Sequence, residues 1–331
     1  MLTSGPFGLA DLDDALAGRL GSGLDRIETL LRASVRSEYP FVTETARHLV
    51  DAGGKRFRPL VVLMAAQFGD PADEAVIKAG VVVELTHLAT LYHDDVMDEA
   101  AMRRGAASAN ARWDNSVAIL AGDFLFARAS ELLADLGPEA VRIHAQTFAR
   151  LVTGQIEETV GPGERDAVTH YLKVVADKTG SLIATSGQYG AMFSGADPEV
   201  VDVMTRFGEE IGIAFQLADD VLDVASESFQ SGKTPGTDLR EGVRTLPVLH
   251  ALASDDPEGE ELRELLTGDL ADDARHARAL KLLRQSPAMD AARHDLRQYA
   301  DQARAVLQPL PAGPAKDALL GVCALVVERS G

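Results

Sequence analysis

The sequence predicts an all-α protein, folded as one domain of roughly ten or more helices. Ala, Leu, Glu and Arg dominate the 331 residues, and apolar residues recur at spacings of three and four. Alternating apolar and polar runs, which are typical of strands, are scarce, and no Pro/Ser-rich linker divides the chain. The expected helices are separated by short breaks at Gly53–Gly54, Gly69–Pro71, Gly137–Pro138, Gly161–Gly163, Asp197–Pro198, Ser231–Gly236 and Leu310–Pro314.

The composition limits the partners and the compartment of the protein. A net charge of −19 argues against a broad basic surface for nucleic acid, although local Lys and Arg still allow an anionic substrate. One cysteine, Cys323, permits neither a disulfide nor a thiolate metal site, so a reducing cytoplasm is expected. The N-terminus lacks a signal-peptide pattern, and no run approaches the roughly 18 apolar residues of a membrane span. We therefore expect a cytoplasmic protein without a transmembrane segment.

A basic turn at 53–59 precedes an apolar helix that is expected to start near Pro59. Its sequence, GGKRFRP, joins two glycines to three cations within four residues. A helix N-terminus flanked by Lys and Arg is a good cradle for phosphate. The spacing differs from that of a P-loop, so another kind of phosphate site is predicted, with a plain basic surface turn as the alternative.

The sequence DDVMD at 94–98 ends a long apolar run that predicts a helix from about Val81 to Asp98. Helical geometry puts Asp94 and Asp98 about 5–6 Å apart at Cβ, on one stripe with His87. Carboxylates this close repel one another unless a cation lies between them. Oxygen ligands without a cysteine cluster favour Mg²⁺, whose remaining positions go to water and substrate phosphate. A solvated helix end is the alternative.

A second copy of this pattern, DDVLD at 219–223, argues against a mere solvated helix end. Asp219 and Asp223 are again four residues apart, so they predict a second metal-binding wall. Two such walls facing each other would hold a diphosphate between metal ions. EF-hand calcium binding is not expected, because the central Gly and the closing Glu of that loop are missing.

Further polar residues flank the acidic motifs. Gln216 precedes Asp219 by three residues and shares its helix face, which directs the amide toward the same site. Lys178 and Lys233 each lie in a segment with a helix breaker, and Lys233 follows the second motif closely enough to fold back over it. The pair at 103–104, two arginines after the first motif, forms another compact cationic cluster. Taken singly, each of these features is more often structural than functional.

This ordered set of motifs resembles the trans-isoprenyl diphosphate synthase (polyprenyl synthetase) family of medium- and long-chain type. The resemblance implies a homodimer with the isoprenoid synthase fold, a single-domain multi-helix bundle around a central cavity, spanning 1–331 with core motifs in 51–249. It implies a magnesium-dependent prenyltransferase that joins isopentenyl diphosphate head to tail to an allylic diphosphate and releases pyrophosphate. The matching motifs are GGKRFRP at 53–59, HLATLYHDDVMDEA at 87–100, RRG at 103–105, AGDFLFARA at 121–129, KTGSL at 178–182, and FQLADDVLD with GKTPGTDLREG at 215–242.

The resemblance also implies a role for each matching residue. The family's magnesium ligands correspond to Asp94, Asp98, Asp219 and Asp223, with Asp95 and Asp220 as weaker contacts. Its isopentenyl diphosphate pocket corresponds to Lys55, Arg58, His87 and Arg104. The groups around its allylic diphosphate correspond to Arg103, Lys178, Gln216 and Lys233. Thr179, together with Gln216, resembles the oxygen-bearing pair that steadies the developing carbocation.

The last motif departs from the family pattern at one position. Many relatives carry a lysine directly after its EG, where this chain has Val243 followed by Arg244. On a helix, a shift of one residue turns a side chain by about 100°. Whether Arg244 replaces the missing diphosphate contact therefore stays open.

Product length depends on the volume below the first acidic motif. Relatives with short products tend to carry aromatics four or five residues before Asp94, where this chain has Thr90 and Ala89. These small residues leave room, so we expect a product longer than C20, in the C30–C50 range, for a quinone side chain. Tyr92 and Phe124 are candidates for a lower plug. A short-chain farnesyl or geranylgeranyl diphosphate synthase is the alternative.

Other classes of protein fit the motifs less completely. A metal phosphohydrolase of the HD type would use His93–Asp94, but it leaves the second acidic motif and the basic turn unexplained. A terpene cyclase would be expected to carry an NSE-type motif in place of DDVLD. A catalytically inactive regulatory subunit would be expected to lose one acidic motif, and both are intact here.

Overall fold

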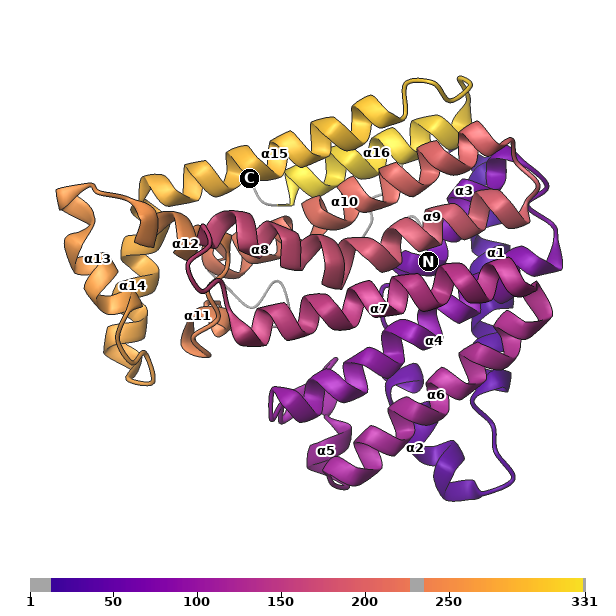
Figure 1. Cartoon of the computed structure of the whole chain (residues 1–331), viewed down its shortest axis with the longest axis horizontal. Coiled ribbons are helices and arrows are strands. Elements are labelled where there is room, and N and C mark those ends of the chain that lie inside the picture. Colours follow the sequence, from indigo (N-terminus) through magenta and orange to yellow (C-terminus); the bar gives the residue numbers. More distant parts are fainter. Residues whose placement is uncertain (1–12, 227–234, 330–331) are drawn as a thin grey trace. The chain divides into compact units, whose positions relative to one another are not determined.

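The computed structural model describes residues 13–226 and 235–329, and the all-α prediction is confirmed (Figure 1). The α-helices in this part of the chain are α1 (Asp14–Ser34), α2 (Pro40–Asp51), α3 (Phe57–Ala65), α4 (Glu74–Met97), α5 (Ala109–Arg112), α6 (Asn115–Leu136), α7 (Pro138–Val160), α8 (Ala167–Val175), α9 (Ser181–Phe193), α10 (Pro198–Ala225), α11 (Thr237–Arg240), α12 (Leu246–Ala253), α13 (Glu260–Leu266), α14 (Asp273–Gln285), α15 (Pro287–Val306) and α16 (Pro314–Glu328). Shorter elements are η2 (Ala66–Phe68), the π-helix η3 (Ala176–Gly180), η5 (Pro257–Gly259), and a ribbon of β1 (Met102–Arg103) and β2 (Ala106–Ala107).

Helix starts follow the capping side chains that the sequence provides. Asp13 caps α1 by accepting from the Leu16 N–H, and Asp166 caps α8 in the same way. Asp73 caps α4, so this helix begins at Glu74, earlier than the Val81 suggested by the apolar run. The first acidic motif is therefore carried by a helix of 24 residues.

The chain forms two compact units, each assembled from three segments. The first comprises Met1–Ala149, Leu182–Gly208 and Pro309–Leu319. The second comprises Arg150–Ser181, Glu209–Gln308 and Leu320–Gly331. Helices α7, α9, α10 and α16 contribute residues to both units. The single domain expected from the sequence stays a prediction.

The core of the first unit is built around α4. This helix packs against α6, α3 and α1, and Figure 1 shows α4 and α6 side by side. Two glycines permit the close approach of neighbouring helices: a Cβ at Gly80 would lie 2.4 Å from Ile27, and one at Gly122 would lie 2.4 Å from His93. By length and composition α4 would also suit a membrane span, but 72% of its most apolar window is buried within the protein.

In the second unit, α12 packs against α15, α8 and α13. A hydrogen bond of 2.7 Å between His250 Nε2 and Asp295 Oδ2 joins α12 to α15. Arg284 on α14 donates to the carbonyl of Val224 at 2.6 Å, near the end of α10. These contacts hold α12 to α15 and α14 to the end of α10.

Candidate active site

The first acidic motif forms the last turn of α4, and its three aspartates lie in different environments. Asp94 is half-buried and Asp98 is exposed, whereas Asp95 is fully buried. Arg103 Nε donates to Asp95 Oδ1 over 2.6 Å. Burial raises the pKa of Asp95, and the nearby Arg103 charge opposes this rise. Asp95 therefore ties the motif to the β1–β2 ribbon, and Asp94 and Asp98 remain as the outward pair.

This carboxylate pair fits a magnesium ion. Mg²⁺ usually takes one or two protein carboxylates and fills its other positions with water and phosphate. Within residues 13–226 and 235–329, no group of three or more His, Cys, Asp or Glu side chains could hold a metal by itself. A metal at Asp94 and Asp98 would therefore take its other ligands from water or substrate phosphate.

The ribbon turns the RRG segment back toward the basic turn. Met102 pairs with Ala107 and Arg103 pairs with Ala106, so the loop consists of Arg104 and Gly105 alone. Both have positive φ, 53° and 78°, as a tight two-residue hairpin loop requires. This ribbon was not predicted, because strands of two residues are too short to show alternation.

Positive charge gathers around His87 in the first unit. Burial and four neighbouring arginines hold the pKa of His87 well below its ordinary value, so the imidazole is neutral at pH 7. Burial lowers the pKa of Arg58 to about 10, although the Glu84 carboxylate counteracts this. Arg58 Nε has no hydrogen-bond partner in the described part of the chain. Such a cluster is suited to an anion with several oxygens, as predicted for the isopentenyl diphosphate pocket.

Arg104 has a structural role in this pocket. Its Nη1 donates to the carbonyl oxygens of Leu49, at 3.1 Å, and Gly53. A Cβ at Gly54 would lie 2.8 Å from the Arg104 Cζ, so a residue without a side chain is needed there. Arg104 thus holds the basic turn from the side of the ribbon, while Lys55 is exposed beside it.

The second acidic motif lies near the end of α10, in the second unit. Asp219 has a side chain 42% exposed and accepts from Arg329 Nη2 over 3.0 Å. Asp223 accepts the backbone N–H groups of Thr237 and Asp238 over 3.2 and 3.3 Å, at the start of α11. Both carboxylates of this motif therefore have protein partners in the second unit, Arg329 for Asp219 and the start of α11 for Asp223. The metal-binding role of both stays a prediction.

Buried hydrogen bonds orient the Gln216 amide. Asp220 is only 1% exposed, and it accepts from the Tyr171 hydroxyl and, over 3.0 Å, from Gln216 Nε2. Since the amide N–H₂ faces Asp220, Gln216 Oε1 faces Thr179, whose hydroxyl donates to it over 3.5 Å. Burial raises the pKa of Asp220 to about 7, against the hydrogen bonds from Tyr171 and Gln216. The structure thus brings the predicted pair Thr179 and Gln216 together.

Lys178 lies with Thr179 in the π-helix η3, between α8 and α9. Single π turns inside α-helices recur at functional sites. Lys178 Nζ lies 2.6 Å from the Glu158 carboxylate on α7. A Cβ at Gly154 would come within 2.8 Å of the Lys178 backbone nitrogen, so η3 packs tightly on α7 here. The other predicted lysine, Lys233, lies outside the described residues.

The residues predicted to govern product length lie inside the first unit. Ala89 is fully buried, with its carbonyl 3.1 Å from the position a Cβ would take at Gly122. Thr90 is half-buried. Tyr92, one of the two candidate plugs, is fully buried and donates to the Thr45 carbonyl over 2.6 Å. Tyr92 therefore braces α4 against α2, and its role as a plug stays a prediction.

The residues that depart from the family pattern do not lie on a helix. Val243 and Arg244 are in the turn between α11 and α12, and Val243 is 43% exposed. A rotation of 100° per residue therefore does not describe them, and that part of the sequence argument is wrong. Glycine at 242, with φ of 76°, breaks the helix just before them.

Comparison with known proteins identifies the family. The chain matches the family model described as polyprenyl synthetase over residues 39–283. It is 53% identical to a nonaprenyl diphosphate synthase of Mycobacterium tuberculosis, over 97% of both chains. A geranylgeranyl pyrophosphate synthase from Corynebacterium glutamicum, solved with calcium and isoprenyl diphosphate, is 50% identical, with a TM-score of 0.88 over 96% of this chain and 98% of that one. A decaprenyl diphosphate synthase from Rhodobacter capsulatus is 33% identical, with a TM-score of 0.86 over 96% and 99% of the two chains.

The chain therefore belongs to the polyprenyl synthetase family. It is a prenyltransferase of isoprenoid biosynthesis, and the predicted all-α isoprenyl diphosphate synthase fold is confirmed. The phosphohydrolase and cyclase alternatives are set aside by this membership. Sequence reasoning missed three residues that contact the site, Glu84, Tyr171 and Arg329. None of them belongs to a motif with a chemical signature, and Arg329 is 110 residues from its partner.

Proposed function

We propose that this prenyltransferase condenses isopentenyl diphosphate head to tail with an allylic diphosphate, with Mg²⁺ as its metal, and releases pyrophosphate. The observation that carries the proposal is the outward pair Asp94 and Asp98 on the same helix as His87, which lies among four arginines. One face of α4 thus offers metal ligands next to a pocket for a second diphosphate. The calcium and isoprenyl diphosphate in the Corynebacterium structure are consistent with such a site.

The residues divide the chemistry between them. Bound magnesium would neutralise the leaving pyrophosphate. Arg58 and His87 hold isopentenyl diphosphate so that its double bond faces the allylic carbon. As the allylic C–O bond breaks, the oxygens of Thr179 and Gln216 stabilise the carbocation. The double bond then forms the new C–C bond, and the proton lost from the isopentenyl unit passes to pyrophosphate. Lys178 is the described lysine predicted to bind that pyrophosphate.

We propose a product longer than C20, in the C30–C50 range, for a quinone side chain. The small residues Ala89 and Thr90 and the similarity to nonaprenyl and decaprenyl diphosphate synthases support this length. A geranylgeranyl synthase of comparable identity makes the C20 product the alternative.

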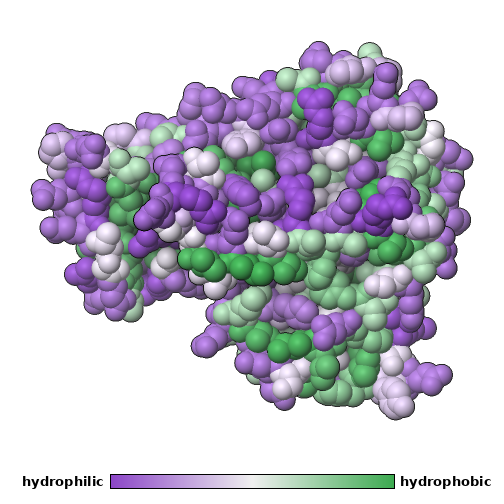
Figure 2. Space-filling model, in the orientation of Figure 1, coloured by the Kyte–Doolittle hydropathy of each residue, from purple (hydrophilic) through white to green (hydrophobic). Residues whose placement is uncertain are grey.

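The enzyme is proposed to act as a cytoplasmic homodimer without a membrane span. On α7, Val152, Ile156 and Val160 follow one another at four-residue spacing and are 38%, 57% and 75% exposed. Figure 2 shows an apolar band along this part of α7. A second copy of the chain that covers this α7 stripe would remove it from water. One relative is named heptaprenyl diphosphate synthase component 2, so pairing with a different subunit is the alternative.

One incubation tests the reaction and the product together. Purified protein is given labelled isopentenyl diphosphate, Mg²⁺ and one of three allylic primers, of C10, C15 or C20. We expect pyrophosphate release that requires both substrates, and labelled products of C30–C50 after dephosphorylation and chromatography. Release of phosphate without isopentenyl diphosphate, or products that stop at C20, would contradict the corresponding part of the proposal.

A further inference from the structure

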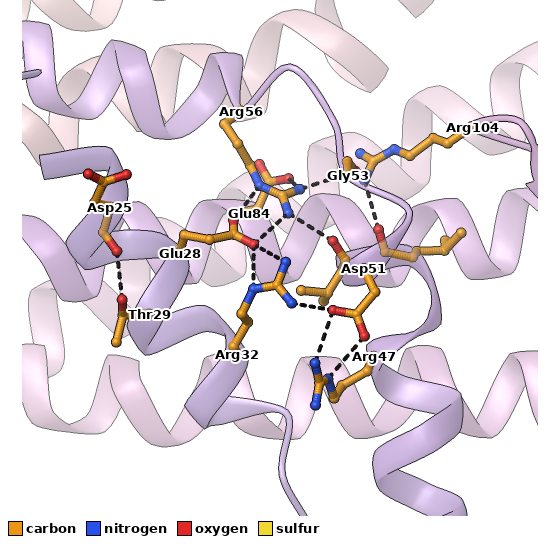
Figure 3. A network of polar contacts seen from close by, with 12 residues as sticks. Asp25, Glu28, Thr29, Arg32, Arg47, Asp51, Gly53, Arg56, Glu84 and Arg104 are labelled. Carbon is orange, nitrogen blue, oxygen red and sulfur yellow. Dashed lines mark hydrogen bonds and ion pairs between the residues drawn. The ribbon is translucent and has the colours of Figure 1, made fainter. Parts of the chain in front are cut away.

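Arg56, the middle cation of the basic turn, is fully engaged by protein groups. Its Nε donates to Glu28 over 3.0 Å, and its Nη1 donates to Glu84 over 2.8 Å. Its Nη2 donates to the Val50 carbonyl over 3.1 Å. Figure 3 shows the Arg56 guanidinium beside the carboxylates of Glu28 and Glu84. Only 12% of its side chain is exposed. The position of Arg56 between two predicted diphosphate ligands, Lys55 and Arg58, suggests that it binds the substrate too. Its donors are instead directed at protein groups.

The backbone at Arg56 is held in an unusual conformation. Its φ of 51° and ψ of 35° lie in the left-handed region, which non-glycine residues rarely adopt. This residue directly precedes α3, and it follows Gly53 and Gly54, which both have positive φ. Glycines restrict the backbone less than other residues do, so the bonds from the Arg56 guanidinium add restraint to this turn.

Glu84 provides the buried end of this restraint. It lies on α4, three residues before His87, and it is 1% exposed. Its charge favours the protonated form of Arg58 and raises the pKa of Arg56, where burial alone would lower both. A buried carboxylate at this point therefore offsets the mutual repulsion of the surrounding arginines.

We propose that Glu84 and Arg56 are a positioning pair for the isopentenyl diphosphate pocket: the pair locks the basic turn so that Lys55 and Arg58, on either side of Arg56, are presented to the diphosphate. Arg56 itself does not bind the substrate. This inference rests on the proposed function, because it assigns a role within the pocket that the condensation requires.

A positioning pair and a purely stabilising ion pair can be distinguished by their effect on substrate binding. Breaking a positioning pair should weaken the binding of isopentenyl diphosphate and leave that of the allylic substrate nearly unchanged. Glu84→Gln keeps the shape of the side chain and removes its charge. We expect the KM for isopentenyl diphosphate to rise about tenfold, with the kcat and the KM for the allylic substrate changed less than about twofold. Calorimetric titration with isopentenyl diphosphate alone should show the same weakening. The matched control is Glu74→Gln on the same helix, whose partner Arg26 lies on the surface, and it should change neither constant.

Arg56→Lys provides a second test, with circular dichroism and Tm recorded for every variant. Lysine keeps the charge but cannot bridge Glu28 and Glu84 with a planar fork, so it should also weaken isopentenyl diphosphate binding. If both variants lower the Tm but leave the KM and the calorimetric Kd unchanged, the pair only stabilises the fold and the inference is overturned. If Arg56→Lys weakens binding while Glu84→Gln does not, Arg56 contacts the diphosphate directly, which also overturns it. Failure of the wild-type protein to condense the substrates would instead refute the proposed function.

Discussion

The Tyr171 hydroxyl donates a hydrogen bond to the buried carboxyl group of Asp220. This bond occupies Oδ2 of Asp220, and Gln216 Nε2 donates to Oδ1. The contact thus determines which end of the Gln216 amide faces Thr179. A tyrosine on α8 thereby orients an oxygen that is proposed to face a carbocation.

Tyr171→Phe should therefore impair the chemical step. We expect the kcat to fall about tenfold, which corresponds to loss of one hydrogen bond to a charged group, while both KM values stay within about twofold. The matched control is Tyr189→Phe, a buried tyrosine that donates to the Ala140 carbonyl in the other unit. It should lower the Tm and leave the kcat unchanged. Equal kcat values for the two variants would show that Tyr171 is only structural.

Removing the metal ligands should abolish elongation. Asp94→Ala and Asp219→Ala are each expected to lower kcat/KM by about 10²- to 10³-fold, because the leaving pyrophosphate loses its counter-charge. Chelation by EDTA should stop the wild-type enzyme, and added Mg²⁺ should restore it. Asp135→Ala, which removes a surface carboxylate paired with Lys78, is the control and should remain active. Normal elongation by the Asp94/Asp219 double variant would refute the metal assignment.

The neutral state of His87 predicts how stability depends on pH. The pKa of His87 is held well below its ordinary value of 6.5 in the folded protein, first by burial and then by the arginines. Below about pH 6.5, His87 therefore binds a proton in the unfolded chain and stays neutral in the folded chain. The free energy of unfolding falls as the pH falls. His87→Gln should reduce this loss. The check is the urea midpoint of both proteins between pH 7 and 5; parallel curves would show that His87 does not titrate as described.

Larger side chains below Asp94 should shorten the product. Ala89→Phe and Thr90→Phe are both expected to shift the chromatogram of dephosphorylated products to smaller chain lengths. Because Ala89 is fully buried against α6, its replacement should also lower the Tm, whereas the half-buried Thr90 should tolerate the change better. An unchanged product from Ala89→Phe would mean that Ala89 does not line the path of the growing chain.

A charge on the α7 stripe should dissociate the proposed dimer. Ile156→Asp puts a carboxylate in the middle of the apolar residues Val152, Ile156 and Val160, where burial by a second copy would be costly. Sedimentation velocity should show about twice the monomer mass for the wild type and a monomer for the variant. A wild-type protein that sediments as a monomer at micromolar concentration would contradict the homodimer.

Local patterns gave much of the fold and of the first acidic motif. Helical spacing alone put Asp94 and Asp98 on one side of α4, because residues four apart share a face whatever the tertiary structure. The burial of Asp95 could not be predicted from helical spacing. It depends on Arg103, and Arg103 is placed by a ribbon whose two-residue strands leave no periodic signal.

Contacts between distant segments account for most of what sequence reasoning could not reach. Arg329 meets Asp219, and Tyr171 meets Asp220, only after the chain has folded. The role of Glu84 could not be predicted, because a single carboxylate within an apolar run does not alter the helical pattern. The start of α4 was also placed too late, because the cap at Asp73 lies outside the run of apolar residues.

The π turn at η3 makes the number of residues there as important as their identity. Such a turn closes its hydrogen bond over five residues, one more than an α turn, so it contains a residue that a regular helix has no space for. Shortening this segment by one residue would restore a regular helix and turn Thr179 away from Gln216, and Lys178 away from Glu158, by about 100°. Insertions and deletions in this stretch are therefore far more damaging than most single replacements.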